Sequence, residues 1–274
     1  MERRTEALVT LLFDEDPKVA VQAMEKLIHA DEPLDEVFEI YQDSSDPHVR
    51  KRIHQISTVV SRQKRKEKFK DQVRSTDGSL IDALIQLSIL TNPRLSEAAI
   101  RKDFHTLILI LSKGMEGEPV TTEELVGFMR SNNFFVPETF ALEEEMLMTD
   151  IVLKFRLGSA IILSALAFSI GRSCGWEGGI VIYDGHFCLI DKHKKLINPT
   201  LSWKITDAEP KRCFPCRNRD ILYNVLCQLF LTSLQDGDMQ EIHLYGSLLT
   251  ELFDSDMSHL PYPVGNELLP KTGG

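Results

Sequence analysis

The stretch that most constrains the fold lies between residues 158 and 200, where the pattern of the chain changes. Residues 161–174 are apolar on nearly all sides, which predicts a helix inside a domain rather than on its surface. Residues 179–190 then switch to the β-branched and aromatic composition of strands. Within them Asp184-Gly185 either forms a turn between two strands or bulges one continuing strand. Residues 192–195 predict a hairpin tip, and Leu196-Ile197 a returning strand.

Most of the remaining chain has helical periodicity. Residues 79–114 predict two helices separated by Asn92-Pro93, and residues 121–131 a third that begins with Thr121 and Glu124 at capping-box spacing. We expect residues 143–155 to be helical, and residues 220–234 and 238–253 to form two helices joined at Asp236-Gly237. Trp203 is interpreted as a packing residue.

The N-terminal region contains a repeated sequence motif. Asp16-Pro17-Lys18-Val19-Ala20 and Asp46-Pro47-His48-Val49-Arg50 lie 30 residues apart, and each opens an apolar helical run. Aspartate accepts hydrogen bonds from free amides of the first turn, and proline fits there because it needs no amide donor. The pattern resembles two HEAT-like repeats, which we expect to dock on the next segment because two repeats rarely stand alone.

Charge is distributed unevenly. The net charge of −10 disfavours nonspecific nucleic-acid binding by the whole molecule, yet residues 48–74 carry ten Lys or Arg against two acidic residues. Within this region, residues 61–75 lack an apolar stripe. They form either a solvated helix extension or linker, or a patch for an acidic partner, RNA or anionic lipid. That patch would consist of Arg62, Lys64, Arg65 and Lys66.

Composition also bears on location and on domain organisation. The first residues lack the pattern of a signal peptide, and no apolar run is long enough to span a bilayer. Five cysteines, an odd number, are expected to be reduced thiols, so we expect a cytoplasmic protein without a transmembrane segment. The predicted division is residues 1–75 for the HEAT-like repeats and basic linker, 76–255 for a second domain, and 256–274 for a loose tail.

Residues 79–252 resemble the SirB-type bacterial transglutaminase-like proteins, over about two thirds of the chain. The resemblance lies in the order of several short motifs rather than in any one of them. They are Phe134-Phe135, the approach Val152-Leu153-Lys154-Phe155-Arg156-Leu157-Gly158, Gly171-Arg172-Ser173-Cys174-Gly175, Gly185-His186-Phe187, Asn198-Pro199-Thr200 and Asn218-Arg219-Asp220-Ile221-Leu222. The resemblance implies an α+β, mostly helical fold, with a papain-like core in which the central helix packs on a small antiparallel sheet.

The resemblance also implies where a catalytic triad would lie. Active members of the wider superfamily carry a cysteine on the first turn of the central helix, a histidine on the next strand, and an aspartate or asparagine beyond it. Here His186 and Asn198 match the last two positions, but the first turn begins Ser159-Ala160-Ile161-Ile162 and has no thiol. His186 is therefore interpreted as a vestigial residue bonded to Asn198. The alternative is that Ser159 replaces the missing nucleophile.

Cys188 and the pair Cys213 and Cys216 are further candidates for chemical sites. Cys188 lies two residues from His186 on the same strand face, so it is either a relocated nucleophile or a buried core thiol. Cys213-Phe214-Pro215-Cys216 has the spacing of a metal or redox site. A zinc ion needs two further ligands, and no second such motif exists, so ordinary thiols in a loop are favoured and no metal or cofactor is expected.

These features favour a noncatalytic protein-interaction or scaffold protein built on a degenerate transglutaminase-like domain. One alternative is an active hydrolase or acyl transferase, such as a peptidase or amidase, with an atypical nucleophile. Another is an adaptor that binds RNA or anionic lipid through its basic patch. A protein partner is expected in the favoured case.

Overall fold

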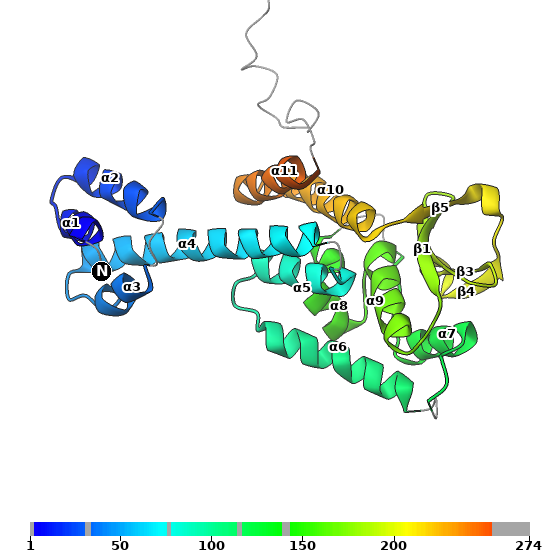
Figure 1. Ribbon diagram of the computed structural model, residues 1–274. Coiled ribbons are helices and arrows are strands. Elements are labelled where there is room, and N and C mark those ends of the chain that lie inside the picture. The colour runs from blue at the N-terminus through cyan, green and yellow to red at the C-terminus, as the bar shows by residue number, and fades with distance from the viewer. Residues whose placement is uncertain (1–2, 31–33, 76–77, 114–116, 139–142, 254–274) are drawn as a thin grey trace, which may run out of the picture. The chain divides into compact units, whose positions relative to one another are not determined.

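A computed structural model describes residues 3–30, 34–75, 78–113, 117–138 and 143–253. Within these ranges the chain is α+β and mostly helical, with one five-stranded antiparallel sheet (Figure 1). It divides into two compact units, Met1–Lys68 and Phe69–Gly274. The expectation of a loose tail at 256–274 lies outside the described residues.

The first unit consists of short helices around a small core of its own. Asp16 and Asp46 begin two of the helices as predicted, since their carboxylates accept the backbone N–H groups of Lys18 and His48 at 2.9 and 2.8 Å. Leu12, Leu27, Val49 and other apolar side chains form the core. The helices are α1 (Arg3–Leu11), α2 (Pro17–Ile28), α3 (Asp35–Tyr41) and α4 (Pro47–Arg74).

The basic region lies in α4 up to Arg74, where this single helix of 28 residues ends. This region is therefore an extension of a helix rather than a linker. The division between the units falls at Lys68, inside this helix, rather than at residue 75. The physical reason is Phe69, which is fully buried in the core of the second unit.

The second unit begins with the end of α4, and its described residues form seven further α-helices. The capping box at Thr121 and Glu124 is present as predicted. Residues 143–155 do not form one helix, because the chain breaks at Met148 between a 3-10 turn and a short α-helix. The elements are α5 (Leu80–Thr91), α6 (Glu97–Ser112), α7 (Thr122–Ser131), η1 (Glu144–Leu147), α8 (Thr149–Phe155), α9 (Ala160–Ser173), α10 (Asn218–Asp236) and α11 (Met239–Phe253).

The strands lie in the order β4-β3-β2-β1-β5. Asp184 and Gly185 form the turn between the first two strands, with φ angles of 50° and 82°, the positive values of a type I′ hairpin. The turn reading of this dipeptide is therefore confirmed. The sequence did not predict the last two strands. The strands are β1 (Gly178–Tyr183), β2 (His186–Asp191), β3 (Lys195–Asn198), β4 (Lys204–Asp207) and β5 (Cys213–Cys216).

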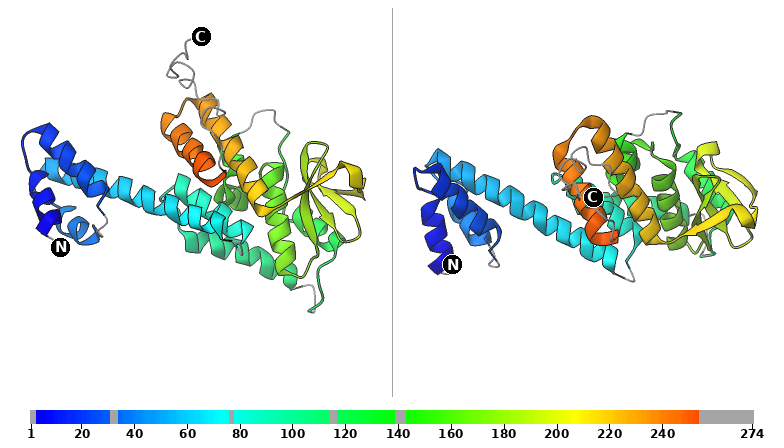
Figure 2. Two further views of the ribbon diagram at one scale, coloured as in Figure 1. Left: turned by 45° about the horizontal axis from the view of Figure 1, so that its top comes forward. Right: turned by 90° about the horizontal axis from the view of Figure 1, so that it is seen from above.

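The sheet has an inner face that packs on α9. Ile180, Phe187 and Leu189 on this face belong to the main core together with the apolar side chains of α9. The Ser164 hydroxyl of α9 donates a hydrogen bond to the Phe187 carbonyl at 3.2 Å. On its other side α9 contacts α5, α6 and α8, so it lies between sheet and helices (Figure 1). Figure 2 shows the same layering, with α10 and α11 packed side by side.

The outer face of the sheet carries a second small cluster, formed by Val181, Cys188 and Leu196. Because β4 and β5 lie at opposite edges, the connection between them, residues 208–212, must run from one edge of the sheet to the other. Ala208 of this connection packs on the cluster. At its far end Arg212 forms an ion pair with Asp184 in the hairpin turn. We call residues 208–212 the covering segment.

Trp203 is buried, and its indole N–H donates to the Phe134 carbonyl at 2.6 Å, so its interpretation as a packing residue is confirmed. None of the helices within the described ranges is long and apolar enough to cross a membrane.

Candidate functional site

Ser159 lies where the resemblance would place a nucleophile, at the start of α9. It is the N-cap residue, with φ −65° and ψ 155°, but its side chain makes no capping hydrogen bond. The hydroxyl is buried and has no hydrogen-bond partner among the described residues. Ala160, Ile161 and Ile162 follow it, so the first turn offers this one hydroxyl and no thiol.

His186 lies on the side of the sheet away from that hydroxyl. It is the first residue of β2, pairs with Tyr183 beside the hairpin turn, and is exposed. Alternate residues of a strand share a face, so His186 points to the outer face with Cys188. Helix α9 packs on the inner face through Phe187 and Leu189. The sheet therefore separates the imidazole from Ser159.

Asn198 ends β3 and is buried. Its carboxamide oxygen accepts hydrogen bonds from the Thr200 backbone N–H at 2.9 Å and the Thr200 hydroxyl at 2.6 Å. Asn198 thus caps the 3-10 turn η2 (Pro199–Leu201). It shares the outer face with His186, but no hydrogen bond joins the two within the described structure. The three predicted site residues are not brought together.

Cys188 has the surroundings of a core thiol. It is fully buried between β1 and β3, in the outer cluster. Burial, with smaller contributions from Cys213 and Asp184, raises the pKa of its thiol to about 12. Because the thiolate is the nucleophilic form, a thiol that stays protonated at neutral pH is a poor nucleophile. Cys188 does share a strand face with His186, as expected, but it is not poised to react.

Cys213 and Cys216 lie on the edge strand β5 rather than in a loop. Residues three apart on a strand point to opposite faces. Accordingly, Cys213 packs on the outer cluster and Cys216 on the main core. Burial raises the pKa of both thiols. This arrangement disfavours a shared metal ion or a bond between the two sulfurs.

The four basic residues suggested as a patch differ from one another in their surroundings. Lys64 is exposed, and its ammonium lies 3.4 Å from a carboxylate oxygen of Asp35. Arg62, Arg65 and Lys66 are half-buried. The Arg65 Nε has no hydrogen-bond partner in the described part of the chain, and burial lowers the pKa of its guanidinium. These four residues therefore do not present a uniformly exposed basic surface.

Sequence reasoning missed a polar cluster around Glu144. The Tyr245 hydroxyl donates to the Glu144 carboxylate at 3.2 Å and lies 3.2 Å from the Thr91 hydroxyl. Burial raises the pKa of Glu144 to about 7, and the negative charge of Glu241 adds to the shift. Such a carboxyl exchanges protons near neutrality, a property often found at functional sites. Nothing in the local sequence distinguishes Glu144 from its acidic neighbours Glu143 and Glu145, so only the fold reveals it.

No protein-family model, curated protein or solved structure gives a significant match to this chain.

Proposed function

We propose that this chain is a noncatalytic protein-interaction or scaffold protein. In this proposal HEAT-like helices in the first unit are joined to a degenerate transglutaminase-like domain with a papain-like core in the second. The observation that carries the proposal is the placement of His186 on the sheet face opposite α9, away from the hydroxyl of Ser159. A general base has to lie within hydrogen-bond reach of its nucleophile, either directly or through one water molecule.

The chemistry of the remaining groups supports the same proposal. Ser159 has no hydrogen-bonded base within the described structure, and a serine hydroxyl requires one to become nucleophilic. The Cys188 thiol is buried and protonated. Asn198 is engaged by Thr200 rather than by an imidazole.

The first unit offers surface for a protein partner. Five of its large apolar side chains are between 40% and 61% exposed, although the unit has only 68 residues. A groove of about 430 Å³ also lies beside α3 and the start of α4, with Phe38 and Ile53 among its lining and the basic Arg50 and Lys51 beside them. Apolar contact area with polar neighbours is the usual composition of a protein interface. The exposed side chains are Leu11, Phe13, Val21, Ile40 and Val59.

The absence of catalysis is tested with a fluorophosphonate, which labels activated serine hydroxyls, and intact-mass measurement. We expect no stoichiometric adduct on the wild-type protein, while an active serine hydrolase treated in parallel is fully labelled. An adduct that disappears in both Ser159→Ala and His186→Ala, but persists in Ser96→Ala, would overturn the proposal. That result would instead support the hydrolase or acyl transferase with an atypical nucleophile.

The interaction itself is tested with a benzophenone amino acid placed at Ile40, which is 61% exposed. Irradiation in an extract of the source cells should give a discrete cross-linked product that excess unmodified protein competes away. The same probe at Leu109, which is 60% exposed in the second unit, is the matched control. Equal cross-linking from both positions would indicate nonspecific contact and contradict a partner surface on the first unit.

A further inference from the structure

The groove of about 430 Å³ in the first unit lies between α3 and the first half of α4. The chain is described without interruption from residue 34 to residue 75, so both helices and the loop between them belong to the described structure. From α3 the walls contain Phe38 and Gln42, which lie one helical turn apart. From α4 they contain Pro47, Arg50, Lys51, Ile53, His54 and Ser57.

The floor of the groove is apolar and is held in place by the core of the unit. Ile53 is only 1% exposed and belongs to that core, and Phe38 is half-buried against it. Ser57 lies on the same side of α4 as Ile53, and its small side chain leaves room at this end. Cavities from about 300 Å³ upward accommodate drug-sized groups, so the groove has room for one large apolar side chain of a partner.

The rim of the groove is basic. Arg50, Lys51 and His54 are exposed there. The Arg50 Nη1 donates to the Ser44 carbonyl at 3.0 Å, which holds this guanidinium at the end of the groove near the loop. Its other N–H groups, and the side chains of Lys51 and His54, make no hydrogen bond or ion pair within the described structure. These donors are therefore available to a partner.

No carboxylate of α3 or of the loop after it lines the groove. The Asp46 carboxylate accepts the first backbone N–H groups of α4 at 2.8 and 3.4 Å and so caps that helix. The Asp35 carboxylate lies 3.4 Å from the Lys64 ammonium, well beyond the last lining residue of α4. Glu39 and Asp43 are exposed to solvent outside the groove. The rim is thus locally positive in a chain whose net charge is −10.

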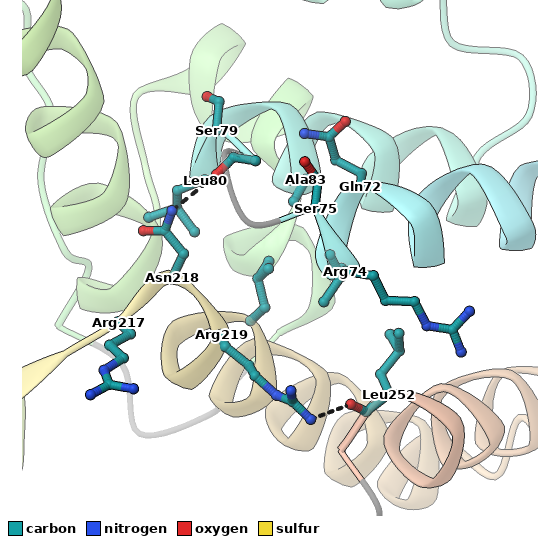
Figure 3. A pocket seen from close by; sticks show the side chains of 13 residues that line it. Gln72, Arg74, Ser75, Ser79, Leu80, Ala83, Arg217, Asn218, Arg219 and Leu252 are labelled. Carbon is teal, nitrogen blue, oxygen red and sulfur yellow. Dashed lines mark hydrogen bonds between the residues drawn. The ribbon is translucent and has the colours of Figure 1, made fainter.

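A cavity of about 440 Å³ in the second unit does not share this arrangement. In Figure 3 the side chains of Arg74 and Arg217 point in different directions, and the Arg219 guanidinium donates to the Leu252 carbonyl at 2.6 Å. The cationic groups of its described walls therefore do not surround a common apolar floor. The groove between α3 and α4 is the better candidate for a binding site.

We propose that this groove binds an acidic segment of a partner protein, in which a large apolar side chain lies next to aspartate or glutamate residues. The apolar side chain packs on Phe38 and Ile53, and the carboxylates lie against Arg50 and Lys51. An apolar centre supplies contact area, and a charged rim selects a partner of opposite charge. The inference rests on the proposed function, because it specifies the partner of the same unit.

The test is selection of random peptides displayed on phage against the full chain. We expect the enriched peptides to combine several aspartate or glutamate residues with phenylalanine, tryptophan or leucine. A fluorescent copy of the most enriched peptide is then titrated with the protein, and anisotropy measures its affinity. No enrichment, or enriched peptides without acidic residues, would overturn the proposal.

Matched variants locate the binding. In Gln42→Glu/Lys51→Glu the peptide should bind about tenfold more weakly or worse, because carboxylates of the groove then face those of the peptide. Lys18→Glu/Gln22→Glu makes the same changes at exposed positions of α2 and should bind like the wild type. Equal weakening in the two double variants contradicts the site.

A gain of affinity excludes unfolding as the explanation. His54→Arg adds a permanent cation to the rim, so we expect the peptide to bind several-fold more tightly. His29→Arg, at an exposed position of the first unit outside the groove, should leave the affinity unchanged. No gain in His54→Arg, or the same gain in both variants, would contradict the rim assignment.

Failure of this site is distinguishable from failure of the proposed function. If Gln42→Glu/Lys51→Glu retains the full cross-linked product of the Ile40 probe, the first unit binds its partner elsewhere and the groove is excluded. If the wild type gives no cross-linked product but the groove still selects acidic peptides, the interaction in the extract is contradicted and the peptide site is retained.

Discussion

At the scale of single residues, Ser159 is an N-cap serine that does not cap its helix. A buried hydroxyl without a hydrogen bond destabilises the folded state by about 1–3 kcal/mol. At a typical N-cap, Ser→Ala lowers the free energy of unfolding by about 1 kcal/mol, because it removes a capping hydrogen bond. Ser159 therefore departs from the rule for its position.

We predict that Ser159→Ala leaves the free energy of unfolding unchanged or raises it by up to about 1 kcal/mol. Ser96→Ala at the start of α6 is the control, because the Ser96 hydroxyl accepts the Ala99 backbone N–H at 3.4 Å and its loss should be destabilising. Urea denaturation measures both. A loss of stability in Ser159→Ala as large as in the control would show that this hydroxyl has a partner in solution.

Because of Glu144, the stability of the protein is expected to fall as the pH rises towards 7. Its pKa is raised from 4.5 to about 7 in the folded state, so the folded chain holds this proton more tightly than the unfolded chain. The contribution of Glu144 to the free energy of unfolding is therefore largest below pH 4.5. It decreases as the pH rises from 4.5 to 7 and stays constant above pH 7. The full shift corresponds to about 3 kcal/mol at most.

We predict that Glu144→Gln is more stable than the wild type at pH 8 and loses the downward slope between pH 5 and 7. Glutamine keeps a hydrogen-bonding group beside Tyr245 without a charge. Glu143→Gln, at an exposed neighbouring position, should retain the slope. Denaturant melts at a series of pH values provide the measurement, and an unchanged slope in Glu144→Gln would contradict the assignment.

At the scale of elements, the β1–β2 hairpin depends on backbone conformation at its turn. Gly185 has φ +82°, which side-chain-bearing residues rarely adopt, although a Cβ there would meet no atom within 4 Å. Substitution at this position therefore acts through backbone strain and not through a clash. Gly127 inside α7 also has nothing within 4 Å, but no such backbone angle.

We predict opposite signs for the same substitution at these two glycines. Gly185→Ala should lower the free energy of unfolding by about 1 kcal/mol. Gly127→Ala should raise it by about 0.5–1 kcal/mol, because alanine favours a helix interior. Thermal melts of the two variants and the wild type measure the change in stability caused by each substitution. Destabilisation by Gly127→Ala would mean that α7 packs more tightly than described.

How far the sequence predicts an element depends on its length and on its turn residues. The β1–β2 hairpin could be predicted because β-branched residues flank Asp184-Gly185. The strands β4 and β5 were missed because each has four residues and one contains Pro215, which is tolerated at the sheet edge where β5 lies. The same limit affected the candidate triad, since motif order does not say which sheet face His186 occupies relative to α9.

At the scale of the whole molecule, each unit has its own buried core. Leu27 is fully buried in the first. Both tryptophans, Trp176 and Trp203, lie in the second. Tryptophan fluorescence therefore reports unfolding of the second unit alone, while far-ultraviolet circular dichroism reports helices of both.

We predict that Leu27→Ala destabilises the first unit by about 2–5 kcal/mol, the usual cost of this truncation in a core. The fluorescence midpoint in urea should stay at its wild-type value while part of the circular-dichroism change moves to lower urea. Leu229→Ala, at a fully buried position of the second core, should shift the fluorescence midpoint instead. A common shift of both signals in Leu27→Ala would show that the units unfold as one.

The basic run in α4 is apparent in the sequence, but Arg62, Lys64, Arg65 and Lys66 do not form one exposed surface in the structure.

The covering segment has a consequence for synthesis of the chain. Domains fold as their residues emerge from the ribosome, and this segment and β5 are the last parts of the sheet to appear. Until they do, Val181 and Leu196 face water on a half-built sheet. A nascent chain that has emerged only as far as residue 207 therefore exposes an apolar surface of the kind that chaperones bind.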